Sequence, residues 1–476
     1  MSTVNEPVTV RFGRRSSRGM LLGFSGPRVA AIGLAALVAV TALMVGGVTG
    51  FVLGAILWAP LLATAFVRIG ARPAIEWIGT AGHYGGRKAS TQTEYRARVH
   101  PVRPTGTLGL GGDAASLRFY LDPDSKAAMI HDPHRRTLTA VLSVSHPAFV
   151  LLDREDQSQR VSRWGRVLAG LAQSGTVSAC QVLEATVADS GDGVAAWWDQ
   201  RGTPDGSWAA NQYQALLEGA RLGSSTHRTT VSVALDMRSA SRAVRAAGGG
   251  VAGAAAVLRQ DMTTLVDGLR QSGLTVGGWL SEEALAHLVA STYDPANEQR
   301  PRSLGNAGPL AISEYWDHLR HDSAWSAVLW ISEWPRIDVP PDFLYPLIFA
   351  PGVRRSLSLT ARPLPSDLAL RQLRKEKTEA VADQTQKARV GQIADYADAQ
   401  EFQDLMDRER SVISGHTDVE FTGLITVTAP TREDLEAAQA TITRAAGAAA
   451  CEVRPLYGRQ AQGFIVGALP LARAPF

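Results

Sequence analysis

VAAIGLAALVAVTALMVGGVTGFVLGAILWAPLLATAFV, residues 29–67, divides the chain into a membrane part and a water-soluble part. None of these 39 residues is Asp, Glu, Lys, Arg or His. One straight helix of that length would measure about 58 Å, whereas the hydrocarbon core of a bilayer is about 30 Å thick. Two spans of about 17 residues fit if the chain turns near Gly46, Gly47 and Gly50, because glycine tolerates turn dihedrals. The stretch therefore predicts a transmembrane helical hairpin over residues 28–68.

Basic residues flank this hairpin on both sides. They are Arg11, Arg14, Arg15, Arg18 and Arg28 before it, and Arg68, Arg72, Arg87 and Lys88 after it. Because positive residues favour the cytoplasmic side, both termini are expected in the cytoplasm and the chain in the cytoplasmic membrane. A cleaved signal peptide is the alternative, but its apolar core would be only 7–15 residues long. We therefore expect a basic segment (1–27), the hairpin (28–68) and a juxtamembrane linker (69–92), with membrane lipid as a partner.

Charge is distributed unevenly along the chain. Residues 1–100 carry a net charge of +8, although the net charge of all 476 residues is only +3. The remaining residues are thus net negative, and direct contact with DNA is not expected, since phosphate neutralisation supplies much of the affinity for DNA. Local basic groups are interpreted as turn and helix decoration: Arg135 with Arg136, Arg354 with Arg355, and Arg371 with Arg374 and Lys375. The two cysteines, Cys180 and Cys451, are expected to be buried and reduced.

The soluble part repeats one pattern three times: a strand, an amphipathic helix and a second strand. The three repeats cover residues 136–188, 227–280 and 419–457. Asp153 is a candidate cap of the first helix, and Thr431 with Asp434 resembles a capping box. We therefore predict an α+β fold with two ferredoxin-like modules, the first cytoplasmic module over 93–300 and the second over 301–476.

A highly charged segment interrupts the second module. Residues 366–414 carry interspersed charges of both signs, with Ser366 as a candidate cap and Gly415 as a stop signal. The segment predicts a charged helical arm, either one helix or two helices broken near Gly391. It is a solvated arm or a docking surface for a partner.

Residues with reactive side chains form no recognisable active site. His131 and His134 flank Asp132 in an expected hairpin loop, and His318 and His321 lie on an expected helix without an HExxH pattern. Ser224, Ser225 and His227 lie beside a strand but specify no triad, and no phosphate-loop motif or GxSxG motif is present. We expect no catalytic, cofactor-binding or metal-binding residues and no enzymatic activity.

The end of the chain resembles a known family. Residues 431–471 contain Gly463 and Phe464 in an expected buried strand over 462–469, followed by Leu469, Pro470 and Leu471. Together with Glu333, Trp334 and Pro335, this order resembles the non-catalytic N-terminal domain of the conjugation ATPase of type IV secretion systems. The membrane hairpin resembles the PrgI-like two-helix subunit of the same systems, and the whole chain is similar to actinobacterial secretion membrane proteins.

This resemblance implies a non-catalytic, membrane-anchored component of a type IV secretion or conjugative transfer system. It would recruit a separate ATPase, because the motor motifs are absent, and it would contact other membrane subunits of the channel. A homo-oligomer stays open, and the final strand is expected to pair with the partner's sheet. Two alternatives remain: a membrane subunit of a type VII secretion system, and a membrane-tethered enzyme that uses His131 and His134.

Overall fold

The computed structural model divides into two compact units, which are described separately. The smaller contains residues 25–93 with 457–459, and the larger contains residues 94–456 and 460–473. The structure describes residues 25–69, 72–97, 105–145, 149–188, 192–203, 205–220, 225–297, 303–335, 337–364, 366–389, 396–413 and 419–473.

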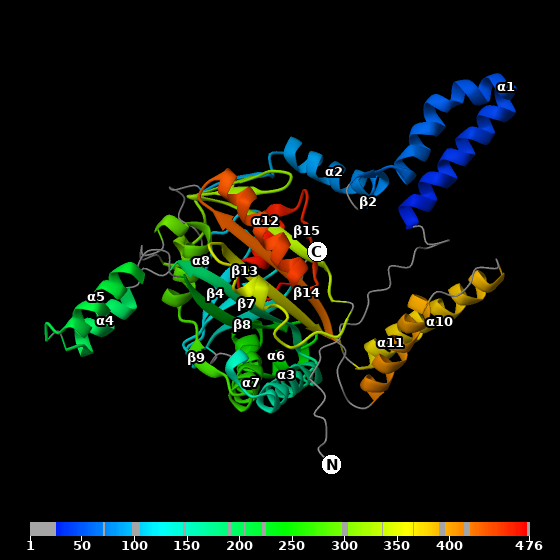
Figure 1. The fold of residues 1–476 in the computed structure, drawn as a ribbon. Coiled ribbons are helices and arrows are strands. Elements are labelled where there is room, and N and C mark those ends of the chain that lie inside the picture. The colour runs from blue at the N-terminus through cyan, green and yellow to red at the C-terminus, as the bar shows by residue number, and fades with distance from the viewer. Residues whose placement is uncertain are drawn as a thin grey trace, which may run out of the picture. The chain divides into compact units, whose positions relative to one another are not determined.

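The smaller unit is dominated by one long apolar helix. Helix α1 (Gly26–Phe66) has 41 residues and is broken at Gly47, whose φ of 59° and ψ of −148° are not helical. The chain bends back there, so that Arg28 Nε donates to Ala65 O at 3.0 Å (Figure 1). Of the described helices, α1 is the one that is long and apolar enough to cross a membrane. Two crossings of the membrane stay a prediction.

A short connection follows α1. Strands β1 (Arg68–Ile69) and β2 (Arg72–Pro73) pair antiparallel, and helix α2 (Ala74–Ala89) comes directly after them. Arg87 and Lys88 lie in the last turn of α2, where positive charge is favoured by the helix dipole.

The larger unit is built on one sheet of thirteen strands, and every described pairing in it is antiparallel. The strand order is β3-β10-β11-β12-β14-β13-β7-β8-β6-β5-β4, with β15 on β12 and β9 on β6. The strands are β3 (Glu94–Arg96), β4 (Arg118–Leu121), β5 (Ala128–Asp132), β6 (Thr137–Ser145), β7 (Val177–Ala188), β8 (Ser225–Asp236), β9 (Thr275–Trp279), β10 (Ala311–Glu314), β11 (Leu319–His321), β12 (Ala324–Glu333), β13 (Arg354–Pro363), β14 (Val419–Ala429) and β15 (Glu452–Pro455).

The two halves of this sheet have the same topology. The first half runs β4, β5, β6, α3 (Arg154–Gln173), β7, β8, α7 (Gly250–Gln271) and β9. The second half runs β10, β11, β12, α9 (Tyr345–Ile348), β13, β14, α12 (Arg432–Ala448) and β15. In the first half, β5 and β9 pair with the same edge of β6, and in the second half, β11 and β15 pair with the same edge of β12. Strands β7 and β13 pair with each other and join the halves.

Each half also carries a helical insertion at the equivalent point. Helices α4 (Asp192–Arg201) and α5 (Trp208–Ala220) lie between β7 and β8, and helices α10 (Ser366–Arg389) and α11 (Tyr396–Ile413) lie between β13 and β14. Helices α10 and α11 are joined by ion pairs from Lys377 to Glu409 (3.1 Å) and from Arg408 to Glu376 (3.5 Å). Of the two predicted forms of the charged arm, the structure therefore has two helices.

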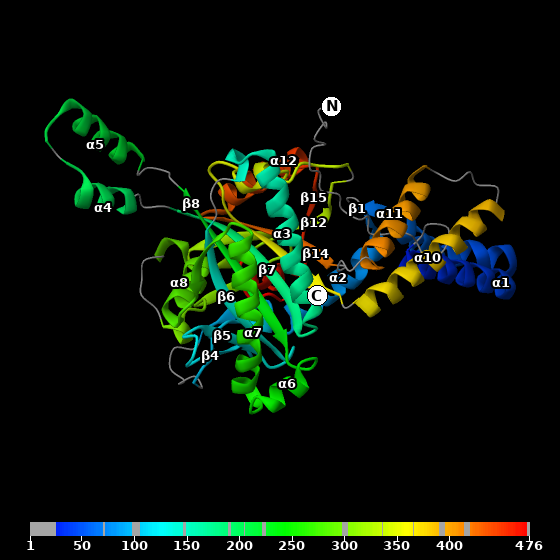
Figure 2. The same cartoon turned by 90° about the horizontal axis from the view of Figure 1, so that it is seen from below.

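Successive residues of a strand point to opposite sides of the sheet, and helices cover both sides, so both faces of the sheet are buried. Helices α3 and α7 lie side by side on the first half, where Leu142 and Leu138 join the core with Leu171 and Leu265 (Figure 2). Helices α8 (Glu282–Tyr293) and α13 (Gln460–Gly467) cover the opposite face through Tyr293, Phe464 and their neighbours.

The structure bears out much of the predicted local structure. The fold mixes helix and sheet, all three strand-helix-strand repeats are present, and Thr431 Oγ1 accepts from Asp434 N at 3.1 Å. Asp153 is at the N-cap of α3 but its side chain makes no capping bond. Both cysteines are free and buried, and burial raises the thiol pKa of Cys180 to about 12 and that of Cys451 to about 11. The predicted module boundary at 300–301 lies outside the described residues.

Two local predictions were wrong. Residues 315–322, expected as a helix, form the turn and second strand of the β10–β11 hairpin, because pairing with β12 determines their conformation. Residues 462–469, expected as a strand, lie mostly in the buried helix α13. Glycines allow this helix to pack closely: a Cβ on Gly463 would lie 2.7 Å from Leu456 Cδ1. The buried helix offers no strand edge to a partner.

Candidate functional site

The residues of the predicted hairpin loop at 131–136 have structural partners. His131 lies in β5, and Asp132 Oδ1 accepts from the backbone N–H groups of His134 and Arg135 at 3.1 Å, which closes the turn. Asp132 also forms an ion pair with the buried Arg473 at 2.9 Å. Among the described residues, no cluster of three or more His, Cys, Asp or Glu side chains could hold a metal.

The histidines at 318 and 321 are separated by the hairpin rather than aligned on a helix. His318 stacks on Tyr315, with ring centroids 4.6 Å apart. His321 is buried, with Nδ1 2.6 Å from Tyr293 O and Nε2 2.8 Å from Ser326 Oγ. Burial lowers the pKa of His321 to about 4, so the ring is neutral at physiological pH. Both ring nitrogens of His321 are thus occupied by structural hydrogen bonds.

The third sequence candidate, around residue 225, is also structural in the described part. Ser224 lies outside the described residues, and Ser225 is the first residue of β8. His227 Nδ1 lies 2.5 Å from Glu184 Oε1, and its ring contacts Phe349 at 4.8 Å between centroids. The described residues do not join a nucleophile to this pair.

A row of buried polar side chains holds the segment that follows α13 against the sheet. Gln181 Nε2 donates to Val466 O at 3.0 Å and to Leu469 O at 3.1 Å, and Gln181 Oε1 accepts from Ala472 N at 2.6 Å. We call the side chains that bind backbone groups of residues 466–472 the polar clamp: Thr139, Gln181, Ser232, Ser356 and Ser358. The clamp draws on strands of both halves, so the C-terminal segment fastens the halves together.

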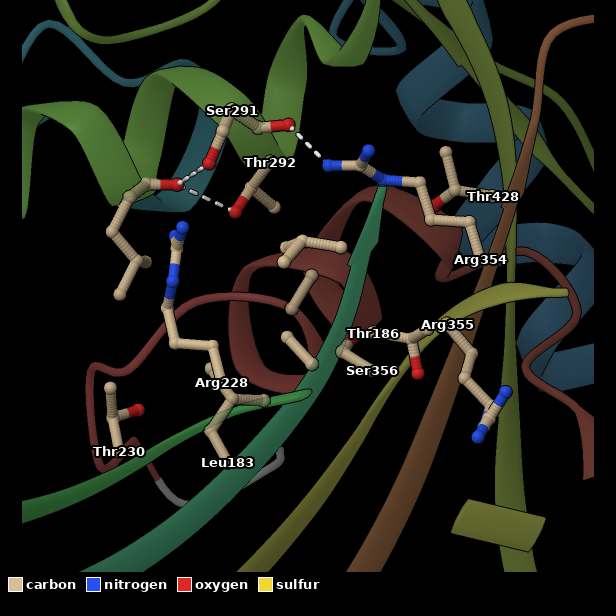
Figure 3. A pocket seen from close by; sticks show the side chains of 14 residues that line it. Leu183, Thr186, Arg228, Thr230, Ser291, Thr292, Arg354, Arg355, Ser356 and Thr428 are labelled. Carbon is tan, nitrogen blue, oxygen red and sulfur yellow. Dashed lines mark hydrogen bonds between the residues drawn. The ribbon is translucent and has the colours of Figure 1, made fainter. Parts of the chain in front are cut away.

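A pocket at the junction of the two halves gathers three arginines. This arginine pocket has a volume of about 40 Å³ and lies between β7, β8, β13, β14 and the end of α8 (Figure 3). Its lining residues are Leu183, Ala185, Thr186, Val187, Arg228, Thr230, Leu288, Ser291, Thr292, Arg354, Arg355, Ser356, Thr428 and Ala468. No carboxylate is among these lining residues, so the charged groups that line the pocket are all positive.

The arginines of the pocket do not all point the same way. Arg354 Nη2 donates to Ser291 O at 3.0 Å, and Arg228 extends toward the same end of α8 from the neighbouring strand β8 (Figure 3). Arg355 points away from both and donates from Nη1 to Ala350 O at 2.9 Å. Burial lowers the pKa of Arg355, and the nearby carboxylate of Glu184 opposes that effect.

Sequence reasoning missed this pocket and the polar clamp. The sequence shows Arg354 and Arg355 as a local pair, but Arg228 lies on another strand and Gln181 has no sequence signal of its own. Arg135, which the sequence places in a turn, lines a second cavity of about 110 Å³ with Asp113, Gln462 and Arg473 among others. Both cavities depend on contacts between segments that are distant in the sequence.

One family of known proteins matches part of the chain. The family described as "Putative type VII ESX secretion system translocon, EccE" matches residues 224–331, from the start of β8 into β12. No curated protein matches the chain. The match contradicts the predicted assignment to type IV secretion and conjugation, and it favours the alternative of a type VII secretion system. Over this segment, the chain is therefore similar to an EccE translocon component of type VII ESX secretion.

Proposed function

We propose that this chain is a non-catalytic membrane subunit of a type VII ESX secretion translocon. The observation that carries the proposal is the family match over residues 224–331, which spans β8, α7 and β9 of the first half of the sheet and most of β10–β12 in the second. The apolar helix α1 supports a membrane location for the chain, since it is exposed over most of its length. The large sheet would then be the part that contacts the rest of the translocon.

The proposed anchor crosses the cytoplasmic membrane twice, with both termini in the cytoplasm. The break at Gly47 divides α1 into two segments of about 20 residues, each long enough to span a bilayer. The arginines at both ends of this stretch favour the cytoplasmic side. Cysteines introduced at positions 2 and 414 should both be inaccessible to an impermeant thiol reagent added outside the cell. Labelling of one position alone would refute two crossings.

The soluble part would act through binding rather than chemistry. We interpret the two halves as ferredoxin-like modules, because each follows a β-α-β-β-α-β order with the last strand beside the first. The paired helices α10 and α11 expose Leu368, Val381 and Ile413 and are a candidate contact for another subunit. Other membrane subunits of the translocon are the expected partners, and a separate secretion ATPase, membrane lipid and a second copy of the chain stay predictions.

An export assay tests this function. Deletion of the chain from a cell with a type VII system should abolish export of the substrates of that system, and the wild-type chain should restore it. A chain without residues 25–66 should not restore export, because it lacks the anchor. Unchanged export after deletion would overturn the proposal.

A further inference from the structure

We propose that the arginine pocket binds the phosphoryl group of a ligand, either free phosphate or a phosphate ester. The pocket is formed by strands from both halves of the sheet and by the end of α8. Its lining combines positive charge, hydroxyl groups and a small volume. This inference concerns a separate feature of the larger unit and does not rest on the proposed role in secretion.

The charge in the pocket favours an anion. Arg228 comes from the first half and Arg354 from the second, and both extend toward the end of α8. The planar guanidinium group of arginine presents a fork of N–H donors that matches two oxygens of a phosphate. Arg355 points away from the other two, so Arg228 and Arg354 are the arginines that would hold the ligand.

Hydroxyl groups supply further donors. Of the six Ser and Thr side chains that line the pocket, Ser291, Thr292 and Ser356 already donate to backbone carbonyls, whereas the hydroxyls of Thr186 and Thr230 are left to donate to a ligand. Thr230 is only 2% exposed, and its Oγ1 has no hydrogen-bond partner. A buried hydroxyl without a partner costs free energy, so a ligand oxygen that accepts from Thr230 would stabilise the site. Phosphate oxygens are strong acceptors of this kind.

The volume limits the group that can enter. A cavity needs roughly 10–15 Å³ to hold one water molecule. The pocket, at about 40 Å³, has room for only a few groups of the size of a water molecule. A single phosphoryl group fits this space, whereas a sugar or a nucleobase does not. The remainder of a phosphate ester would lie outside the mouth of the pocket.

Titration calorimetry with inorganic phosphate on the detergent-solubilised full chain tests the site directly. The wild-type chain should bind phosphate at millimolar concentration or below, with chloride at equal ionic strength as the reference. Arg228→Gln should weaken binding roughly 10- to 100-fold, because one charge-assisted contact is lost. Arg320→Gln is the matched control, since Arg320 lies over Trp325 on the same sheet and outside the pocket. Absent binding by the wild type, or equal binding by the two variants, would overturn the proposal.

Two further variants, Arg228→Lys and Thr230→Val, separate loss of the site from loss of the fold. Arg354→Gln is not used for this purpose, because it also removes the bond to Ser291 O and a folding defect would mimic weak binding. Arg228→Lys keeps the charge but not the fork, and it should bind with intermediate affinity. Thr230→Val should weaken phosphate binding about tenfold without lowering stability, because its hydroxyl has no partner to lose. Wild-type phosphate affinity in both Arg228→Lys and Thr230→Val would contradict the assignment.

The source of the phosphate is distinguished by comparing two additions. The full chain is placed in nanodiscs of phosphatidylcholine alone or with phosphatidic acid, and its melting temperature is measured with and without dissolved phosphate. Stabilisation by dissolved phosphate that Arg228→Gln abolishes indicates a soluble ligand. Stabilisation only by phosphatidic acid, again abolished by Arg228→Gln, indicates a lipid headgroup. Stabilisation by neither addition would overturn the site.

Discussion

Replacing Gln181 with leucine should remove the centre of the polar clamp while nearly preserving side-chain volume. The Gln181 side chain is 0% exposed. Its amide nitrogen donates to Ser358 Oγ at 2.8 Å, to Val466 O at 3.0 Å and to Leu469 O at 3.1 Å, and its oxygen accepts from Ala472 N at 2.6 Å. Leucine can make none of these four bonds.

The cost of the change follows from what each group retains. Val466 O still accepts from Ser358 Oγ at 3.2 Å, and Leu469 O still accepts from Leu471 N at 2.9 Å. The N–H of Ala472 loses the acceptor that the clamp provides. A buried polar group left without a partner costs about 1–3 kcal/mol, and a weakened one costs less. We therefore expect the free energy of unfolding to fall by about 2–4 kcal/mol.

Urea unfolding of the full chain in detergent, followed by tryptophan fluorescence, measures this change. Gln372→Leu is the control, because Gln372 is exposed on α10 and its side chain bonds to the neighbouring Glu376 at 3.1 Å. The free energy of unfolding of this variant should stay within about 0.5 kcal/mol of the wild type. Hydrogen exchange of the amides in residues 466–473 should also accelerate in Gln181→Leu. A loss of stability below about 1 kcal/mol with unchanged exchange would refute the role of the clamp.

Three further predictions concern other parts of the chain. Gly54→Leu should disturb the bend of α1, because a Cβ at Gly54 would lie 2.7 Å from Ala42 Cβ. Gly33→Leu is the control, since a Cβ at Gly33 would meet nothing within 4 Å. Disulfide cross-linking of cysteines placed in the two segments should fall only for Gly54→Leu. Thr431→Ala should lower the free energy of unfolding by about 0.5–2 kcal/mol, measured by urea unfolding, because the capping bond of α12 is lost. Burial lowers the pKa of His321 to about 4 in the folded chain, whereas the ordinary value of 6.5 applies in the unfolded chain, so between these pH values only the unfolded chain binds the proton. The free energy of unfolding should therefore fall by about 1.4 kcal/mol per pH unit as the pH decreases from 6.5 to about 4. His321→Gln should remove this contribution from the pH dependence of urea unfolding.

Local structure was predictable where a single period dominates the sequence. Residues 431–449 combine a cap, an acidic first turn and apolar residues at helical spacing, and they form α12 as expected. Strands β14 and β15 on either side were also predictable from their apolar patterns. In these segments, local preference and tertiary packing favour the same structure.

The wrong local predictions arose where tertiary contacts decide between alternatives. Residues 462–469 are almost entirely apolar, and a short apolar run does not distinguish a buried helix from a buried strand. Close packing at Gly463 and Gly467 determines the outcome, and those contacts come from Leu456 and Thr426. Similarly, β11 exists because it pairs with β10 and β12, which the spacing of His318 and His321 cannot indicate.

The candidate site could not be predicted, because its residues are distant in the sequence. Arg228 and Arg354 line the same pocket because β7 lies between β8 and β13. This strand order follows from the pairing of the two halves through β7 and β13. The sequence predicts two modules of one type, but not which helices correspond, since the 20-residue helix α3 corresponds to the four-residue helix α9. The assignment to type IV secretion rested on weak motifs near the C-terminus, where the expected strand is in fact a helix.

Affinity purification of the full chain from gently solubilised membranes, with mass spectrometry of the co-purifying proteins, tests the proposed role most directly. The account predicts stoichiometric recovery of other membrane subunits of a type VII ESX translocon, and loss of that recovery when residues 25–66 are deleted. Recovery of a different secretion machine, or of the chain without any translocon subunit, would contradict it.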